Sequence, residues 1–418
     1  PGADGGSINI RGIGSITGSS QPLIIVDGVE GVSLNDVDPN IIENVSILKD
    51  AASTAVYGVR GTNGVIVIKT RRGQSGKTSI AYNGFVSQQT PTNFPNLLSS
   101  VDHMILENEF STNAGGPIIH SDTKINTYRT TAADNLNVFD TDWKDLIFQN
   151  SGLMQNHNII INGGSDKASF LVSGTYLNQQ GLVVNNSFKK YDLRLNGDIN
   201  LTKKIKFTTD LFYTKSTNVQ PGGMSPNEII QRGISMARLW PAKFGNEQYG
   251  DAGQSNRINP VGAAESSGFN HAQTPTLSVR FGLSAELFKN FVLDASYNAR
   301  NSFTEAYVAR GSYDVYNPNP ATNSYLLAQV IGDSALNYTN RRNITNQYNI
   351  SGTYSYNLKQ DHQFKLQGGF QALDNRVTAI SAGRQGLPDP NRPYLNLASP
   401  SQQTSSGSAT DYSLAGFF

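Results

Sequence analysis

Apolar and polar residues alternate along much of the chain from about residue 77 onward, and residues 190–201 show this most clearly. The apolar positions there are Tyr191, Leu193, Leu195, Ile199 and Leu201, and the polar ones are Lys190, Asp192, Arg194, Asn196, Asp198 and Asn200. The same alternation is found in residues 277–287, 291–300, 346–357 and 363–372. A period of two is typical of a strand with one apolar and one polar face. The pattern therefore predicts a series of long, half-buried β-strands.

The segments between these strands fall into two length classes that take turns along the chain. The short ones are residues 163–167, 202–204, 289–290 and 359–361, and the long ones are roughly residues 90–150, 179–187, 217–274, 303–342 and 375–409. Short turns at one end of the strands and long loops at the other are typical of a transmembrane β-barrel. A soluble sandwich or propeller also alternates and stays an alternative.

We therefore predict a mostly β protein with a transmembrane antiparallel β-barrel, of which about ten strands lie in this chain. The last of them ends at Phe418. An open ten-stranded edge would leave unpaired backbone groups in lipid, so we expect the native barrel to contain more strands than this chain supplies.

The first 75 residues lack this long alternation. They contain strand-like runs at residues 7–10, 23–26, 45–48 and 65–69, separated by glycine-rich turns, and a short helix around residues 50–57 with Asp50 as its N-cap. We predict a small α+β domain over residues 1–75, followed by the barrel part over residues 76–418.

Composition narrows the classes of function. The chain has 33 Lys plus Arg against 32 Asp plus Glu, which argues against a nucleic-acid-binding protein, because such proteins need a basic surface. It has no cysteine, which favours an extracytoplasmic location. No stretch reaches the ~20 apolar residues of a membrane-spanning helix. Because the chain starts at Pro1 without a methionine and stops in an apolar run, we expect an internal fragment.

The sequence motifs that resemble catalytic or cofactor-binding sites are each incomplete. Residues 11–18 resemble a dinucleotide-binding loop, but the third glycine comes one place late and no helix can follow. Ser46 and Lys49 match S-x-x-K without its companion motifs. The five histidines are scattered, and the carboxylates at Asp36 and Asp38 suit surface turns better than acid–base chemistry. We expect no enzyme activity, no cofactor and no metal.

One tight corner stands out in residues 56–68, VYGVRGTNGVIVI. Gly58, Gly61 and Gly64 are interpreted as positions where φ is positive or a side chain would clash. Asn63 and Gly64 are a favoured two-residue hairpin turn, which would feed a strand at residues 65–69.

Several spaced motifs in residues 7–75 resemble one family. They are the Ile10-Arg11-Gly12 triplet, then PLIIVDG at residues 22–28, DPNIIE at 38–43, VSILKDA at 45–51 and YGVRGTNGVI at 57–66. In this order they resemble the plug domain of SusC/RagA-like TonB-linked (TonB-dependent) outer-membrane transporters. The barrel part is similar to the family by pattern more than by motif.

The resemblance implies active import of oligosaccharides, or of peptides, across the outer membrane of a Gram-negative bacterium. It implies three protein or lipid partners: a SusD-like lipoprotein, TonB acting through a TonB box absent from this fragment, and outer-membrane lipid. A siderophore or cobalamin receptor of the TonB-dependent class is an alternative, and so is a non-transporting β-rich surface protein that binds glycans. The sequence does not distinguish a glycan from a peptide substrate.

The resemblance also assigns a structural or gating role to the residues of the plug motif. These residues are Arg11, Gly12, Asp27, Gly28, Lys49, Asp50, Tyr57, Gly58, Arg60, Gly61, Asn63 and Gly64. We expect Tyr57, Arg60 and Asn63 to fix a corner of the plug without touching substrate.

Overall fold

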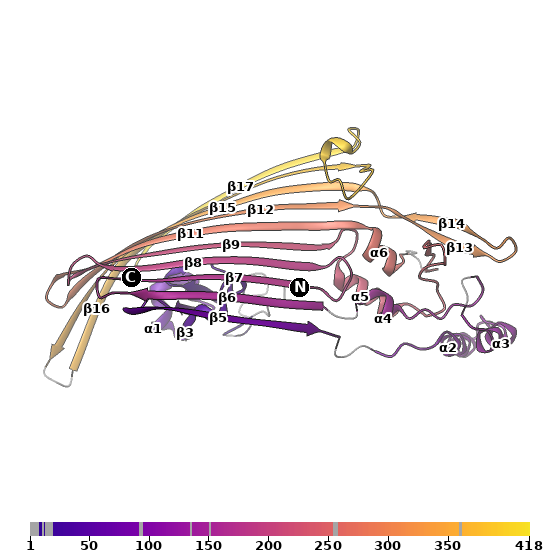
Figure 1. Ribbon diagram of the computed structural model, residues 1–418, viewed down its shortest axis with the longest axis horizontal. Helices are drawn as coiled ribbons and strands as arrows, with labels where there is room; N and C mark the ends of the chain where they lie inside the picture. The colour runs from indigo at the N-terminus through magenta and orange to yellow at the C-terminus, as the bar shows by residue number, and fades with distance from the viewer. Residues whose placement is uncertain are drawn as a thin grey trace.

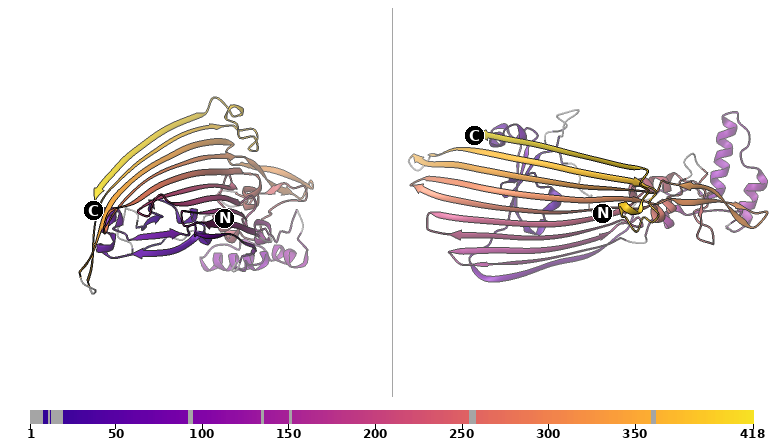
Figure 2. Two further views of the ribbon diagram at one scale, coloured as in Figure 1. Left: turned by 60° about the vertical axis from the view of Figure 1, so that its left-hand side comes forward. Right: turned by 90° about the horizontal axis from the view of Figure 1, so that it is seen from above.

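The chain forms a small domain of strands and short helices, a long curved sheet, and a group of loops and helices at one end of that sheet (Figure 1). The computed structural model describes residues 8–10, 12, 20–91, 95–133, 136–149, 152–253, 258–358 and 362–418. Figure 2 shows that the small domain lies on the inner side of the curved sheet. Within the described residues, no helix is both long and apolar enough to cross a membrane.

The small domain, which we call the plug, contains a four-stranded sheet in the order β2-β1-β4-β3. Its strands are β1 (Leu23–Val26), β2 (Val29–Glu30), β3 (Ile42–Leu48) and β4 (Val65–Thr70). The two central strands, β1 and β4, are parallel, and each has an antiparallel neighbour at the edge. Val26, Val37, Ile66 and Ile68 form its buried core. The strand-like runs at residues 23–26, 45–48 and 65–69 are therefore confirmed as strands.

Short helices complete the plug. They are η1 (Leu34–Asp36), η2 (Pro39–Ile41), α1 (Ala51–Thr54) and η3 (Ala55–Gly61). The last two replace the single helix predicted over residues 50–57. The run at residues 7–10 is not a strand where it is described, at residues 8–10, and Ser7 lies outside the described residues.

The predicted hairpin at Asn63 and Gly64 is wrong, because the segment before it is the 3-10 helix η3 and not a strand. The glycines do serve the corner in the way expected. Gly58 has φ of 56° and Gly64 has φ of 91°, which is the left-handed region that favours glycine. A Cβ on Gly61 would come within 3.0 Å of Thr54.

The long sheet, which we call the wall, has ten antiparallel strands, as predicted. In order across the sheet they are β5 (Gly76–Gln89), β6 (Gly152–Gly164), β7 (Ala168–Gln180), β8 (Ser187–Asn200), β9 (Ile205–Pro221), β11 (Gly268–Phe288), β12 (Phe291–Arg310), β15 (Ala335–Leu358), β16 (His362–Gln385) and β17 (Gln403–Phe417). Each strand pairs with its neighbour in sequence, so the alternation of side chains stays in register across the wall.

The two faces of the wall differ as the alternation predicts. On β8, Arg194 and Asn196 are buried on the inner face, which the plug contacts, whereas Leu193 and Leu195 are 46% and 40% exposed on the outer face. The outer face also carries a row of stacked or tilted rings at His157, Tyr176 and Tyr191. An apolar outer face and a polar inner face are the arrangement of a barrel wall in lipid.

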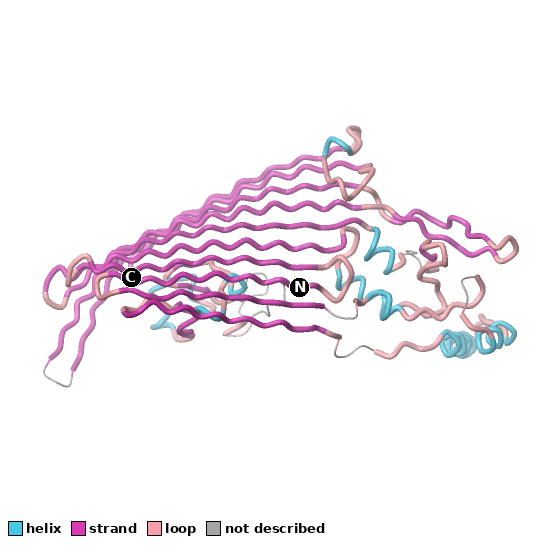
Figure 3. The backbone as a smooth tube through the Cα atoms, in the orientation of Figure 1, coloured by secondary structure: helices cyan, strands magenta, loops and turns pink. Residues whose placement is uncertain are grey.

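The long connection between β5 and β6 has the predicted length, residues 90–151, and the other long connections are shorter than predicted. The wall strands run past the clear alternation, so that β9 ends at Pro221 and β11 begins at Gly268. The remaining loops hold α2 (Ser100–Asn113), α3 (Asp122–Thr130), α4 (Trp143–Ile147), α5 (Pro226–Ser235), α6 (Pro260–Ser266), η4 (Leu395–Leu397), β10 (Tyr249–Gly250), β13 (Tyr313–Asn319) and β14 (Ser324–Ile331). Figure 3 shows these helices gathered beyond one end of the strands.

Four connections between wall strands, including the short one with Val183 between β7 and β8, share one apolar core, and we call this group the loop module. Its fully buried members include Trp143 of α4, Ile229 of α5, Val261 of α6 and Val315 of β13. Each helix has a side-chain N-cap, such as Asn259 before α6 and Ser225 before α5. The module is therefore a folded unit and not a set of independent loops.

Candidate functional site between the plug and the wall

Buried charged and polar side chains gather where the plug meets the inner face of the wall. The contact starts from the sequence VDGV, which forms the turn between β1 and β2. Asp27 has φ of 50° and Gly28 has φ of 82°. Positive φ at both central residues makes a two-residue turn whose twist suits an antiparallel pair, and Asp-Gly is a favoured sequence for it. The turn places the Asp27 carboxylate and the Gly28 carbonyl toward the wall.

Asp27 links the plug sheet to β8. Its Oδ1 accepts a hydrogen bond of 2.9 Å from the Thr70 backbone N–H, and its Oδ2 accepts one of 2.6 Å from the Thr70 hydroxyl. The same Oδ2 pairs with the Arg194 guanidinium of β8. Both side chains are about nine-tenths buried, with 10% and 8% exposure. The carboxylate therefore joins β1, β4 and the wall at one point.

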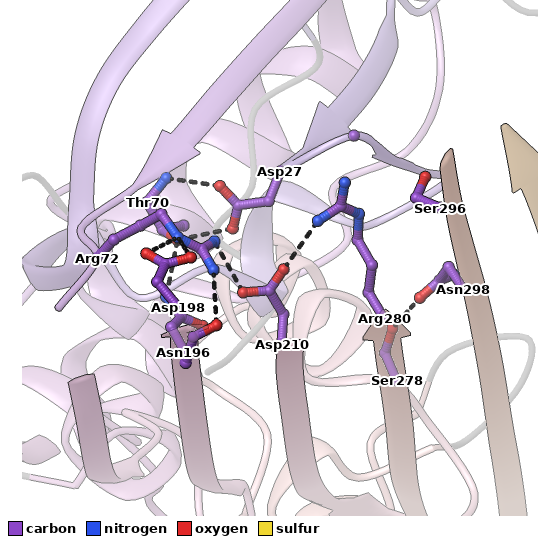
Figure 4. Close-up of polar contacts among 12 residues, drawn as sticks. Asp27, Thr70, Arg72, Asn196, Asp198, Asp210, Ser278, Arg280, Ser296 and Asn298 are labelled. Atoms are coloured by element: carbon purple, nitrogen blue, oxygen red, sulfur yellow. Dashed lines mark hydrogen bonds and ion pairs between the residues drawn. The ribbon is translucent and has the colours of Figure 1, made fainter. Parts of the chain in front are cut away.

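Arg72, just after β4, forms the second link (Figure 4). Its Nε lies 2.9 Å from Asp198 Oδ2, and its Nη1 lies 2.8 Å from Asp210 Oδ1. Arg280 of β11 donates to the other oxygen of Asp210 at 3.2 Å. Burial alone would lower the pKa of Arg72, but the carboxylates of Asp198 and Asp210 raise it above its usual value. The guanidinium therefore stays charged while it is half-buried.

We call this set of contacts the anchor. Its plug residues are Asp27, Thr70 and Arg72, and its wall residues are Arg194, Asn196, Asp198, Asp210 and Arg280. Asn196 adds a neutral contact, because its Nδ2 donates to the Arg71 carbonyl at 3.0 Å. The three arginines are matched by three aspartates, so the anchor is electrically balanced.

The contact continues across the wall on both sides of the anchor. Toward β12, Arg300 donates to the Gly31 carbonyl and lies 3.3 Å from Asp36 Oδ2. Toward β6 and β7, Asp38 accepts hydrogen bonds from Asn158, at 2.9 Å, and from Thr175. The predicted turn is confirmed at Asp38, whose Oδ1 accepts from the Asn40 backbone N–H at 2.9 Å. The predicted surface location is wrong, because the carboxylates of Asp36 and Asp38 both face the wall.

At the far end of the contact, Glu30 and Arg60 of the plug meet two glutamines of the wall, and we call this set the latch. Glu30 is 4% exposed and pairs with Arg60. Gln371 of β16 donates to Glu30 and accepts from Arg60 at 3.0 Å. Gln347 of β15, which is buried, accepts from the Glu30 backbone N–H at 3.2 Å and donates to the Gly28 carbonyl at 3.1 Å.

A cavity of about 580 Å³ lies beside the latch. On the plug side it is lined by Gly28 and by Tyr57 of η3, and on the wall side by residues of β9 to β16. Burial, and then the negative charge of Glu30, raises the pKa of Tyr57, so its hydroxyl is neutral at physiological pH. The contact can thus hold the plug in place, and it leaves an aqueous space at one end.

Most of the residues predicted from the plug motif fall in or near this contact. Asp27 belongs to the anchor, Arg60 to the latch, and Gly28 and Tyr57 line the cavity. Gly58, Gly61 and Gly64 shape the corner around η3. Lys49, Asp50 and Asn63 lie at the ends of the α1–η3 segment, and Asp50 contributes its carbonyl to the Thr54 N–H at 3.1 Å. Gly12 has φ of 77°, and Arg11 lies outside the described residues.

Sequence patterns alone did not single out the wall partners. Arg194, Asp198 and Asp210 sit on faces that the alternation marks as polar, but nothing local separates them from other polar residues of the same strands. The Asp-Gly pair between two short apolar runs was a usable signal for the turn that carries Asp27.

Other candidate sites do not form within the described part of the chain. Ser46 lies in strand β3, and residues 11–18 fall almost wholly outside what the structure describes. Among the described residues, no group of three or more His, Cys, Asp or Glu side chains is arranged to hold a metal ion.

The plug and longer parts of the chain are similar to known proteins. The TonB-dependent receptor plug domain family matches residues 1–65. The TonB-dependent receptor SusC of Bacteroides thetaiotaomicron is 33% identical over 202 residues, which are 46% of this chain and 18% of that protein. These matches are to SusC/RagA-like TonB-dependent receptors, which this chain resembles.

Two further likenesses extend over nearly the whole chain. The TonB-dependent receptor P26 of Formosa agariphila is 26% identical over 432 residues, or 98% of this chain and 40% of that protein. The structure of the RagAB peptide transporter superposes with a TM-score of 0.77 and 19% identity, covering 98% of this chain and 48% of that one. The fold of this chain is therefore that of a plug beside part of a barrel wall, as in TonB-dependent receptors.

The chain spans well under half the length of these curated relatives. They are TonB-dependent receptors by name, and proteins of that family lie in the outer membrane of Gram-negative bacteria.

Proposed function

We propose that the protein containing this chain imports oligosaccharides or peptides across the outer membrane by a TonB-dependent mechanism, together with a SusD-like surface lipoprotein. The plug occupies the inner side of the wall and the wall presents an apolar outer face, so lipid would surround it. The division falls at residues 75 and 76, between the plug and the first strand of the wall. TonB would act through a TonB box elsewhere in the full-length protein.

The observation that carries this proposal is the polarity of the contact between plug and wall. Described contacts from β6 to β16 are mainly hydrogen bonds and ion pairs, in residues such as Asp27, Arg72 and Glu30. A polar contact beside an aqueous cavity can re-form with water after it breaks, so its separation costs less than separation of an apolar core. That property suits a plug that must rearrange each time substrate passes.

The substrate class stays open between oligosaccharide and peptide. The inner face of the wall above the anchor is rich in hydroxyl and amide groups, such as Thr214, Thr276 and Ser302. These groups form hydrogen bonds equally with sugar hydroxyls and with peptide backbones. One solved relative is named as a peptide transporter, which favours testing peptides beside glycans.

We also propose that Tyr57, Arg60 and Asn63 have a structural role and do not bind substrate. Arg60 binds Glu30 and Gln371, and Tyr57 lies beside the latch at the edge of the cavity. The same holds for the other residues of the plug motif, which shape the plug or join it to the wall. A substrate-bound structure with direct contacts from these three side chains would contradict this assignment.

The test is an uptake assay in a strain that lacks the gene. Labelled oligosaccharide mixtures and labelled peptide mixtures are offered separately to the parent strain, to the deletion strain and to a strain without TonB. We expect uptake of one mixture to be lost in both mutants, while uptake of the corresponding monosaccharide or amino acid persists. Unchanged uptake of both mixtures in the deletion strain would refute the proposal, and loss of siderophore uptake alone would support the alternative receptor class.

A further inference from the structure

The two ends of the contact between plug and wall differ in what fills the space between them. At the β6–β7 end, Ile41 of the plug packs against Ile160 and Leu171 of the wall, and all three are buried. At the β15–β16 end there is no such cluster among the described residues, and the cavity of about 580 Å³ separates η3 from the wall instead. One end is therefore dry and packed, whereas the other adjoins water.

The ends differ also in where their charges lie. In the anchor, the ion pairs of Asp27 with Arg194 and of Arg72 with Asp198 and Asp210 each join the plug to the wall, whereas Arg280 pairs with Asp210 within the wall. Separation there would leave charges on both surfaces without partners, which is strongly unfavourable in a buried site.

In the latch, both members of the ion pair belong to the plug. Glu30 and Arg60 remain paired with each other if the plug leaves the wall, and the wall supplies only the neutral amides of Gln347 and Gln371. Opening the latch therefore breaks hydrogen bonds that water can replace, and it leaves neither charge of the ion pair without a partner.

We propose that the plug pivots on the β6–β12 side of the wall, where ion pairs such as Asp36 with Arg300 join the two, and releases at the latch on β15 and β16. Substrate then passes along the wall side of the cavity. This inference rests on the import function proposed above. It assigns the anchor as the fixed side of the plug and the latch as the side that opens.

The lining of the cavity fits a hydrated, polar substrate. The wall contributes hydroxyl and amide side chains at Ser284, Ser296, Asn349 and Ser351, together with the charged Lys206 and Asp294. Arg72 and Arg280 lie at its border with the anchor, where Asp210 binds both of them. Neutral polar groups along the route bind a sugar or a peptide backbone weakly enough to release it.

Thiol labelling tests the location of the route without knowledge of the substrate. The chain has no cysteine, so single cysteines are unique within it. Ser351→Cys places a thiol in the cavity, and Ser173→Cys places one on the buried inner face of β7. The probe is a polymer-linked maleimide, too large for porins, which is added to cells that make the full-length receptor with or without TonB during import.

We expect Ser351→Cys to react about tenfold faster with TonB than without it, as for a tenfold rise in the open population, and Ser173→Cys to stay unreactive. TonB-dependent labelling of Ser173→Cys in place of Ser351→Cys would overturn the proposal. So would equal rates with and without TonB in cells that import substrate. Absence of import in the uptake assay, by contrast, would count against the proposed function itself.

A pair of reversible tethers tests which side opens. Glu30→Cys with Gln371→Cys joins the plug to the wall at the latch, and Thr70→Cys with Asn196→Cys joins them at the anchor. Both pairs are linked by a reducible bifunctional reagent and are measured again after reduction, so each variant is its own control for folding. The thiol of Ser351→Cys is protected while the tether forms and is chemically unmasked afterwards. We expect the latch tether to abolish labelling of this thiol and the anchor tether to leave its labelling unchanged. The opposite result would overturn the assignment of the two sides.

Discussion

The loop module and the contact between plug and wall are both assembled from distant parts of the chain, but different forces hold them. The module closes around Trp143, Ile229 and Val261, which are at most 2% exposed. The contact between plug and wall depends on arginines, carboxylates and amides. Apolar packing stays unfavourable to disrupt in water, whereas polar contacts exchange with water. The comparison indicates that the module is built to keep its shape and the plug to move.

The largest effect is expected in the loop module. Trp143→Ala should destabilise the module by about 3–5 kcal/mol, because it removes a fully buried aromatic side chain and leaves a cavity. Its Nε1 also donates to the Ala237 carbonyl at 3.1 Å, and that bond would be lost. Limited proteolysis of the loops measures the change. Phe110→Ala is the control, since that ring is 77% exposed, and equal protease sensitivity of the two variants would contradict the prediction.

The next effect is expected in the anchor. Arg72→Ala leaves Asp198 and Asp210 without their shared guanidinium, and should weaken the contact by about 3 kcal/mol. The measurement is the urea concentration at which protease begins to cleave the plug in the full-length receptor. Arg71→Ala removes the same charge from an exposed neighbouring side chain and should leave that concentration unchanged. A similar decrease in both variants would mean that net charge matters and not the anchor.

A smaller effect is expected at the latch. Gln347→Ala removes two hydrogen bonds to the plug backbone from a side chain that is 1% exposed, and should cost about 1–3 kcal/mol. The same protease assay applies, with Gln367→Ala as the exposed control on the cavity wall. If Gln347→Ala loosened the plug more than Arg72→Ala does, the ranking of the two sides would be wrong.

Within the module, the cap of α5 should contribute less than its core. Ser225 and Glu228 form a capping box, and Ser225→Ala should cost about 1 kcal/mol. Hydrogen bonds from the Ser225 side chain and backbone lower the pKa of Glu228. The carboxylate's contribution is therefore present above its unfolded pKa and is lost as pH falls through the lower folded value. Acid titration followed by NMR should show this dependence weaken in Ser225→Ala, which loses the side-chain donor and keeps the backbone N–H. An unchanged dependence would exclude the Ser225 hydroxyl as a cause.

The smallest effect concerns Tyr57. Because burial and Glu30 raise its pKa in the folded plug, the stabilising contribution of the neutral phenol is present below the unfolded pKa. It is lost as pH rises through the higher folded value, so the plug should loosen slightly in alkali. Absorbance titration of the receptor against Tyr57→Phe measures the raised pKa. A phenol that ionises at the ordinary tyrosine value would show that Tyr57 is more exposed than the structure has it.

The wall was predictable because its signal is local and repeated. Each strand carries its own alternation, so residues such as Leu193 and Arg194 could be assigned to opposite faces from their neighbours alone. The helices of the loop module were missed, although Ser225 and Asn259 are ordinary cap residues, because the segments around them are short and rich in turn formers.

The candidate site was predictable only in part, and the reason is distance along the chain. The plug motif led to Asp27, Arg60 and the glycine corner. Their wall partners could not be inferred, since Arg60 and Gln371 are 311 positions apart and Asp27 and Arg194 are 167 apart. Pairing over such separations depends on the register of the whole sheet, which no short pattern encodes.

The turn at Asp27 and Gly28 has a consequence for how such chains can change in length. Its carboxylate is fixed to β8 and its next carbonyl to β15, so two consecutive residues span the interior between distant wall strands. An inserted residue would displace one partner or the other, whereas Asn391 and Arg392, in the connection between β16 and β17, are exposed. Insertions and deletions should therefore accumulate in the outer loops and be absent from this turn.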